Sequence, residues 1–264
     1  MNKIKLLSTT IIAIVVLAGC SGYEKILKSK DNELKYSKAL FYYDKGDFYR
    51  ASLLLEQILP IYRGTNRADT VNFYYAYSQY GQGDFLLASS YFDSFRKNYP
   101  KSIFTEQSEY LYAYCFYQTS PRSELDQENT ILAIEALQEF ISKYPSSKKA
   151  EDANKIIAEL FNKLEEKAYK SAWLYYHTEN YKAAIVAFEN SLKEFPNSKY
   201  REEQIYLTLC SAFLYAENSI AEKQKERYQA AEDFYFNFAA EFPNSERMKE
   251  AQKMHEKSLK ALKN

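Results

Sequence analysis

An aromatic residue followed by proline, any residue and serine occurs four times in this chain. The four prolines are Pro100, Pro145, Pro196 and Pro243. An alanine stands twelve residues before each of them, at Ala88, Ala133, Ala184 and Ala231. Proline cannot continue the helix that it follows, and a small residue lets two helices approach closely. The pattern therefore predicts a chain of repeated helical units, each ended by its proline.

Small residues further upstream predict a partner helix in each unit. Four of them fall where a first helix should cross the second, at Ala39, Ala76, Ala113 and Ala172. With only 6 Gly and 6 Pro in 264 residues, we expect an all-α fold of about five helical hairpins. The hairpins are predicted over 33–61, 69–100, 103–145, 165–196 and 202–243, followed by a terminal helix over 245–264. The serine two residues after each proline is expected to be the N-cap of the next helix.

The hairpin unit resembles the tetratricopeptide repeat, in which two antiparallel helices meet at small residues. The resemblance implies that the hairpins stack into a superhelix whose inner face is formed by the first helices. Aromatic residues on these helices suit a groove for an apolar peptide with polar edges, although packing between helices would also use such rings. The candidate groove residues are Tyr36, Tyr43, Phe73, Tyr77, Tyr80, Tyr110, Tyr114 and Tyr117.

Two stretches depart from the short connections of the other units. Residues 119–129 form a predicted loop that contains Pro121. Residues 147–178 contain neither Gly nor Pro, and their apolar residues recur at helical spacing. We expect one long helix or two closely linked helices there, and we place the boundary between two parts of the chain in this stretch.

The first twenty residues read as an export signal. Lys3 and Lys5 precede an apolar run from Leu6 to Leu17, which is short for a permanent membrane span. The run ends in Leu-Ala-Gly-Cys at Cys20, which resembles the lipobox of bacterial lipoprotein precursors. The resemblance implies a signal peptide over 1–19, cleavage before Cys20 and acyl chains that anchor this cysteine in a membrane.

Catalysis, metal binding and nucleic-acid binding are not predicted. The chain has equal numbers of basic and acidic residues, 35 of each, without the clustered basic footprint that nucleic acid requires. The two histidines, His177 and His255, stand far apart, and no phosphate-binding loop or nucleophile motif is present. Cys115 and Cys210 lie among apolar residues and are expected to be buried free thiols. We therefore expect no enzyme activity and no cofactor.

A lipobox, a short linker over 20–32 and five hairpins together resemble the BamD family of outer-membrane assembly lipoproteins. The stretch from Trp173 to Ile185, Trp-Leu-Tyr-Tyr-His-Thr-Glu-Asn-Tyr-Lys-Ala-Ala-Ile, is similar to the fourth-repeat turn of that family. The family uses an arginine of the following helix against its barrel partner, and this position is Ala187 here. The chain therefore departs from the family at that contact.

The resemblance implies a lipid-anchored scaffold at the outer membrane with its body facing the periplasm. Residues 33–146 would receive unfolded outer-membrane barrel proteins. Residues 147–264 would dock on a periplasmic domain of the central barrel component. Two other classes stay open, a periplasmic tetratricopeptide adaptor lipoprotein of envelope biogenesis and a nutrient-binding lipoprotein of the SusD type. The SusD type is much longer and carries large loop insertions, whereas the only insertion here is about ten residues.

Overall fold

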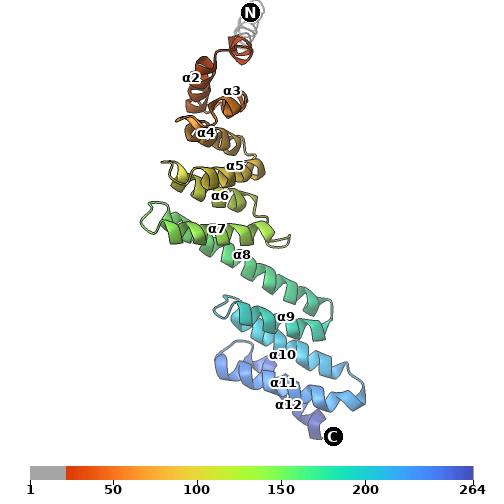
Figure 1. Ribbon diagram of the computed structural model, residues 1–264. Helices are drawn as coiled ribbons and strands as arrows, with labels where there is room; N and C mark the ends of the chain where they lie inside the picture. The colour runs from red at the N-terminus through yellow and green to blue at the C-terminus, as the bar shows by residue number, and fades with distance from the viewer. Residues whose placement is uncertain (1–21, 264) are drawn as a thin grey trace, which may run out of the picture. The chain divides into compact units, whose positions relative to one another are not determined.

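The structure is a computed structural model that describes residues 22–263. The predicted signal peptide and the predicted lipidation site, Cys20, lie outside these residues. Helices are the only regular elements of the described part, and they form tetratricopeptide-type hairpins (Figure 1). The all-α hairpin prediction is thereby confirmed. None of the helices in the described range has the length and apolar character that crossing a bilayer requires.

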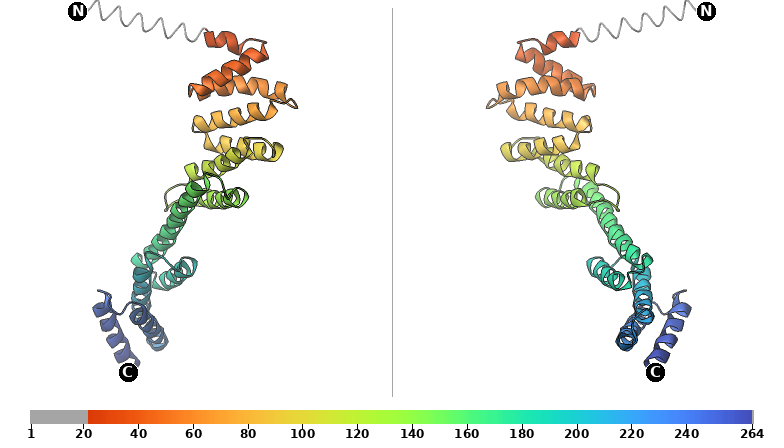
Figure 2. Two further views of the ribbon diagram at one scale, coloured as in Figure 1. Left: turned by 90° about the vertical axis from the view of Figure 1, so that its left-hand side faces the viewer. Right: turned by 90° about the vertical axis from the view of Figure 1, so that its right-hand side faces the viewer.

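The five hairpins lie close to the predicted ranges. Their pairs are α2 (Asn32–Asp44) with α3 (Phe48–Tyr62), α4 (Ala68–Gly81) with α5 (Phe85–Asn98), α6 (Thr105–Thr119) with α7 (Glu128–Lys143), α8 (Ala150–His177) with α9 (Tyr181–Glu194), and α10 (Arg201–Glu217) with α11 (Ala221–Glu241). A final helix, α12 (Met248–Lys263), follows. Consecutive helices pack against each other in the series from α2 through α7 and again in the series from α9 through α12 (Figure 2).

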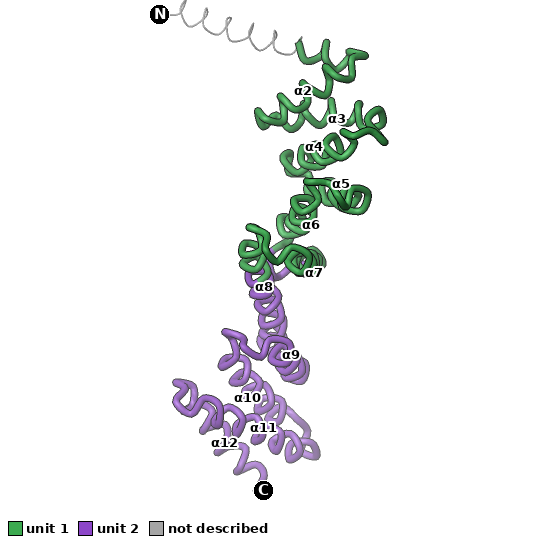
Figure 3. The backbone as a smooth tube through the Cα atoms, turned by 60° about the vertical axis from the view of Figure 1, so that its left-hand side comes forward, with its two compact units in different colours: residues 1–121, 127–157 green, residues 122–126, 158–264 purple. Residues whose placement is uncertain are grey.

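The described chain forms two compact units, coloured separately in Figure 3. Unit 1 extends to Pro121 and includes Gln127–Ile157, whereas unit 2 contains Arg122–Asp126 and the chain from Ala158 onward. The division falls within α8, which is one continuous helix of 28 residues. Its first turns belong to unit 1 because Ala153 and Ile156 are buried there and Asp152 accepts a hydrogen bond from Tyr110 of α6.

Alanine occupies the places where helices cross. The predicted crossing residues have relative exposures of 0 or 1% in both helices of the hairpins. They are Ala39, Ala51, Ala76, Ala88, Ala113, Ala133, Ala172, Ala184 and Ala231. A large phenylalanine or leucine lies four residues after several of them, and Phe92, Leu137 and Phe188 are also fully buried. Small and large residues therefore interdigitate, as a densely packed interior requires.

The turn inside three hairpins needs a left-handed residue. Gly46 and Gly83 have φ angles of 72° and 81°, and the matching position of the fourth hairpin is Glu179 with a φ of 58°. A side chain in this region costs about 1–2 kcal/mol, which glycine avoids. The aspartates that follow the two glycines, Asp47 and Asp84, accept hydrogen bonds from backbone amides in the first turns of α3 and α5.

The serine after each proline caps the turn that leads into the next helix, because its hydroxyl accepts a hydrogen bond from the backbone amide two residues later at 3.0–3.3 Å. The predicted cap therefore lies on this entry turn and not on the first turn of the regular helix. The helices begin three residues later, and the N-cap residues Phe104 and Tyr200 make no side-chain cap hydrogen bond. Three of these serine hydroxyls also donate a hydrogen bond to an acid in the first turn of the preceding hairpin. The pairs are Ser102 with Asp69, Ser147 with Glu106 and Ser245 with Glu202, at 2.6–2.7 Å. These serines therefore join neighbouring hairpins.

Part of the predicted linker over 20–32 is also folded, which corrects that interpretation. Residues 22–27 are helical, and Tyr23, Ile26 and Leu27 pack against the core of the first hairpin. These three apolar residues cover too few positions to predict a helix from the sequence alone.

Replacing Ala231 by leucine tests the helix crossings. The added atoms have no space at a position that is 1% exposed, and overpacking costs about 1–3 kcal/mol. We expect urea unfolding, followed by circular dichroism, to shift by this amount. The matched control is Ala240→Leu in the same helix, which is exposed and should change the free energy of unfolding by less than about 0.5 kcal/mol. Equal effects of both changes would contradict the role of the crossing alanine.

Candidate functional site

Five of the predicted groove residues form a continuous row of rings in unit 1. We call this set the tyrosine row; its members are Tyr43 of α2, Tyr77 and Tyr80 of α4, and Tyr114 and Tyr117 of α6. Ring centroids of consecutive members lie 5.3, 5.5, 6.3 and 5.3 Å apart along the row. Since the rings come from three successive first helices, the row crosses the hairpins rather than following one helix.

The rings of the tyrosine row are half-buried, so each keeps part of its surface accessible. Burial raises the pKa of the Tyr80 hydroxyl to about 12, and the neighbouring Tyr114 adds to this effect. Burial also raises the pKa of Tyr43, assisted by Tyr77 and Tyr74. These two hydroxyls therefore stay neutral at physiological pH and can donate hydrogen bonds. The row presents apolar ring surface with neutral polar edges.

The other three predicted residues are not exposed members of the row, although Phe73 contacts Tyr77 and Tyr110 stacks on Tyr114. Phe73 and Tyr110 have relative exposures of 2 and 3%, so they pack beneath the exposed rings and offer no surface to a ligand. Phe73 stacks on the ring of Phe104 at 4.4 Å, and Tyr110 packs edge-on against Phe140 at 5.5 Å. Tyr36 lies apart from the row, with its ring 5.6 Å from that of Tyr62.

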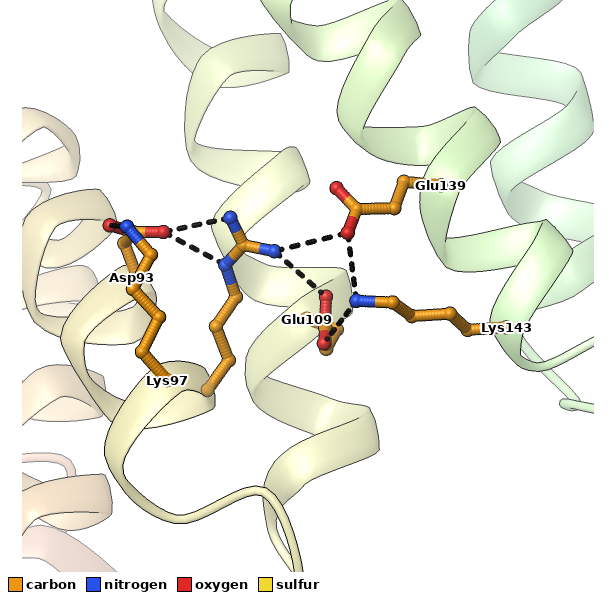
Figure 4. A network of polar contacts seen from close by, with 6 residues as sticks. Asp93, Lys97, Glu109, Glu139 and Lys143 are labelled. Atoms are coloured by element: carbon orange, nitrogen blue, oxygen red, sulfur yellow. Dashed lines mark hydrogen bonds and ion pairs between the residues drawn. The ribbon is translucent and has the colours of Figure 1, made fainter.

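An ion-pair network ties the helix that carries Tyr114 and Tyr117 to its two neighbours (Figure 4). Glu109 of α6, whose side chain is 9% exposed, lies at the centre and contacts Arg96 of α5 at 3.4 Å and Lys143 of α7 at 3.0 Å. Arg96 also reaches Asp93 at 2.8 Å and Glu139 at 3.3 Å. A buried carboxylate with two cationic partners fixes the relative positions of these helices.

Two outer carboxylates of the network have lowered pKa values. Burial of Asp93 acts in the opposite direction, but hydrogen bonds from Lys97 and Arg96 outweigh it and lower the pKa below the usual 3.8. A hydrogen bond from Lys143, with a smaller contribution from Arg96, lowers the pKa of Glu139 below 4.5. The network therefore favours the charged carboxylates at neutral pH.

Unit 2 carries a second surface next to the turn that resembles the family's fourth repeat, although helical periodicity did not identify its exposed residues. We call it the α8–α9 patch; it consists of Leu174, Tyr175 and Val186, which are 58, 44 and 51% exposed, with Ala187. Tyr175, Val186 and Ala187 line a pocket of about 490 Å³ together with Asn180 and Lys182. Exposed apolar side chains around a pocket are typical of protein contact surfaces. Helical periodicity alone does not show whether another hairpin covers such residues.

The described residues hold no arrangement suited to a metal. No three His, Cys, Asp or Glu side chains between positions 22 and 263 come together as ligands. Cys115 and Cys210 are free and buried, as predicted. Burial raises the pKa of the Cys115 thiol to about 12 and that of Cys210 to about 11, so both thiols stay protonated.

Replacing Arg96 by methionine tests the ion-pair network. The change leaves Asp93 without one partner and the buried Glu109 with Lys143 alone, which should cost about 1–3 kcal/mol of unfolding free energy at pH 7. Because the folded-state pKa values of Asp93 and Glu139 are lowered, their contribution is present above pH 4.5 and is lost as the pH falls through those lowered values. The difference between wild type and variant should therefore shrink in acid.

Urea unfolding at neutral and acid pH measures this effect. Lys155→Met is the control, since Lys155 belongs to an exposed pair with Glu151 and should change stability by less than about 0.5 kcal/mol. An Arg96→Met penalty that is the same at both pH values would contradict the electrostatic account.

Residues 28–205, about two thirds of the chain, match the family described as YfiO, outer membrane lipoprotein. Two relatives carry the name outer membrane protein assembly factor BamD. The one from Rickettsia prowazekii (strain Madrid E) is 24% identical over 212 residues, 78% of this chain and 82% of that protein. The one from Caulobacter vibrioides (strain ATCC 19089 / CIP 103742 / CB 15) is 25% identical over 221 residues, 76% of this chain and 70% of that protein.

A solved structure, the TPR2AB-domain:pHSP90-complex of yeast Sti1, is similar at 12% identity with a TM-score of 0.40. The alignment covers 86% of this chain and 98% of the yeast chain. The family match extends from the start of the first hairpin to α10. This chain therefore belongs to the YfiO family of outer membrane lipoproteins, the family of BamD.

Proposed function

We propose that this protein is an assembly factor for outer-membrane barrel proteins, acting as a lipid-anchored scaffold without catalysing a reaction. Family membership and the names of both relatives support the assembly role. In this proposal Cys20 carries the lipid, the protein lies at the outer membrane and the hairpins face the periplasm. Unit 1 receives the unfolded substrate, and unit 2 docks on a periplasmic domain of the central barrel component.

The tyrosine row is the observation that carries the substrate role. Side chains on one face of an extended strand are spaced by two residues, or about 6.7 Å. The rings of the row are 5.3–6.3 Å apart, so alternating apolar residues of a strand would meet successive rings. Neutral tyrosine hydroxyls at the edges would donate hydrogen bonds to carbonyl groups of the strand, which has no neighbouring strand before it folds.

The binding expected from such a surface is weak. Apolar burial contributes about 25 cal/mol per Å², from which the cost of ordering a flexible strand must be subtracted. The result is affinity in the micromolar range, roughly 8 kcal/mol of binding free energy. An assembly factor has to release its substrate to the barrel that inserts it, and weak binding permits that release.

The α8–α9 patch supports the docking role of unit 2. Its pocket combines the apolar Val186 and Ala187 with the amides of Asn180 and Asn190 and the charge of Lys182. A protein interface needs an apolar centre with a polar rim, and this composition provides both. The resemblance of the fourth-repeat turn implies that Ala187 takes the place of the family's arginine, so we expect the contact here to depend on shape and apolar burial instead of a guanidinium group.

A peptide with the alternating apolar residues and terminal aromatic of a barrel strand tests the substrate site. We expect Tyr80→Ala and Tyr114→Ala to weaken its binding roughly 5- to 30-fold in fluorescence anisotropy, since one aromatic contact is worth about 1–2 kcal/mol. Tyr80→Phe keeps the ring and should lose only the contribution of one hydroxyl. Tyr175→Ala in unit 2 is the control and should bind as wild type. Unchanged binding by both alanine variants, with intact circular dichroism, would refute the site.

Copurification from gently solubilised membranes tests the docking surface. We expect wild-type protein to recover a large outer-membrane barrel with periplasmic repeat domains, identified by mass spectrometry. Val186→Glu places a charge at the centre of the α8–α9 patch and should reduce this recovery at least tenfold. The control Ile103→Glu alters a residue of unit 1 that is 87% exposed and should recover the barrel normally. Recovery of a transporter or a cell-wall protein instead would favour the adaptor alternative.

A further inference from the structure

The chain that follows the predicted anchor is fixed to the first hairpin. The hydroxyl of Tyr23 donates a hydrogen bond to the backbone carbonyl of Arg50 at 3.2 Å. The Tyr23 ring packs edge-on against Tyr42 at 5.4 Å, and the Arg50 guanidinium lies 5.3 Å from the same ring. Ile26 and Leu27 add apolar contacts with the hairpin core. Residue 22 is therefore held at a defined place on unit 1.

That place is the turn end of the first hairpin. Tyr42 and Arg50 flank the turn between α2 and α3, which occupies residues 45–47. The chain then runs along the hairpin to Asn32, where α2 begins at the opposite end. The entering chain thus meets the hairpin at its turn and not at its open end.

Covalent geometry limits how far this turn can be from the lipid. Gly22 follows Cys20 by two positions, with only Ser21 between them, and an extended chain spans at most about 3.6 Å per position, or about 7 Å in all. The headgroup region of a bilayer is about 5–8 Å thick on each side. If Cys20 bears acyl chains, as the proposed function requires, the turn end of the hairpin lies against the headgroups.

The exposed side chains at this end have the chemistry of a membrane interface. Phe41 and Tyr49 are 49 and 63% exposed. The amino groups of Lys38 and Lys45 lie 5.3 and 6.0 Å from the Phe41 ring. Aromatic rings with long basic side chains beside them are enriched at the level of lipid headgroups, where the ring enters the apolar layer and the ammonium stays in water.

Negative charge at this end does not oppose such a contact. Asp47 forms an ion pair with Arg50 at 3.0 Å and caps α3. Asp44 is exposed, and Glu24 beside Tyr23 is paired with Lys28 at 3.0 Å. Lys38, Lys45 and Arg50 therefore outnumber Asp44 and Asp47. The end of the hairpin therefore carries a small net positive charge that suits a surface containing anionic lipid.

We propose that the turn end of the first hairpin is a membrane-contact surface in which Phe41 and Tyr49 enter the bilayer interface beside the lipid anchor. This contact rests on the lipidation of the proposed function and goes beyond it, because it fixes the orientation of the first repeat at the membrane. Several acyl chains on Cys20 would already hold the protein at the membrane, so this contact would add a defined orientation rather than attachment.

The single tryptophan of the chain allows a direct test. Trp173→Phe removes the only native signal, and Phe41→Trp, Tyr49→Trp or Ile61→Trp then places one tryptophan on the first hairpin. The lipidated full-length protein is reconstituted into phosphatidylcholine vesicles with a minority of phosphatidylglycerol and bromine-labelled acyl chains. Ile61 is the matched control because it is 52% exposed and lies about 18 Å from Tyr49 along α3.

We expect bromine to quench tryptophan at positions 41 and 49 at least twofold more strongly than at position 61. Equal, weak quenching at all three positions in protein that floats with the vesicles would overturn the contact surface and leave the anchor intact. Protein that is made and folded but does not float would overturn the anchor and the surface together. Flotation and quenching therefore separate failure of the proposed function from failure of this inference.

Discussion

Close approach of helices at buried alanines is the constraint on which this structure depends. Ala39, Ala76 and Ala113 recur every 37 residues and are fully buried at the same position of successive first helices. A larger side chain would separate the helices, and the rings that fill the space between hairpins would lose their contacts. Because each hairpin buries its apolar face only against its neighbours, this spacing also sets how the functional surfaces line up.

The tyrosine row is one consequence of that spacing. Tyr43, Tyr80 and Tyr117 each follow a crossing alanine by four residues, so they lie one helical turn beyond it. Stacking the hairpins brings these positions together with Tyr77 and Tyr114 into one row of rings. A surface made this way extends across three hairpins, which suits an extended ligand better than a compact one.

Helical periodicity and the prolines were sufficient to predict the hairpins, since both act within a few residues. They were insufficient for features that depend on a neighbouring hairpin. Phe73 and Tyr110 occupy the expected face but pack against Phe104, which precedes α6, and Phe140 of α7. The same limit explains why the serine–acid hydrogen bonds between hairpins were not predicted, because the acid that Ser102 contacts is 33 residues away in the sequence.

The two candidate surfaces differ in chemistry, which fits two different ligands. The tyrosine row of unit 1 offers ring faces with neutral hydroxyls to a strand that must later leave. The α8–α9 patch of unit 2 offers aliphatic side chains and a pocket, as a lasting protein contact would need. With Cys20 as the predicted anchor, the protein would hold a substrate and a partner together at the membrane without acting chemically on either.

The most direct test of this account is the content of barrel proteins in the outer membrane after the protein is depleted from its own cells. Quantitative mass spectrometry of the outer-membrane fraction should show a broad fall in barrel proteins while other lipoproteins keep their levels. Full-length protein expressed from a second copy should restore the barrels. Unchanged barrel levels after depletion would contradict the assembly function, although the hairpin fold would stand.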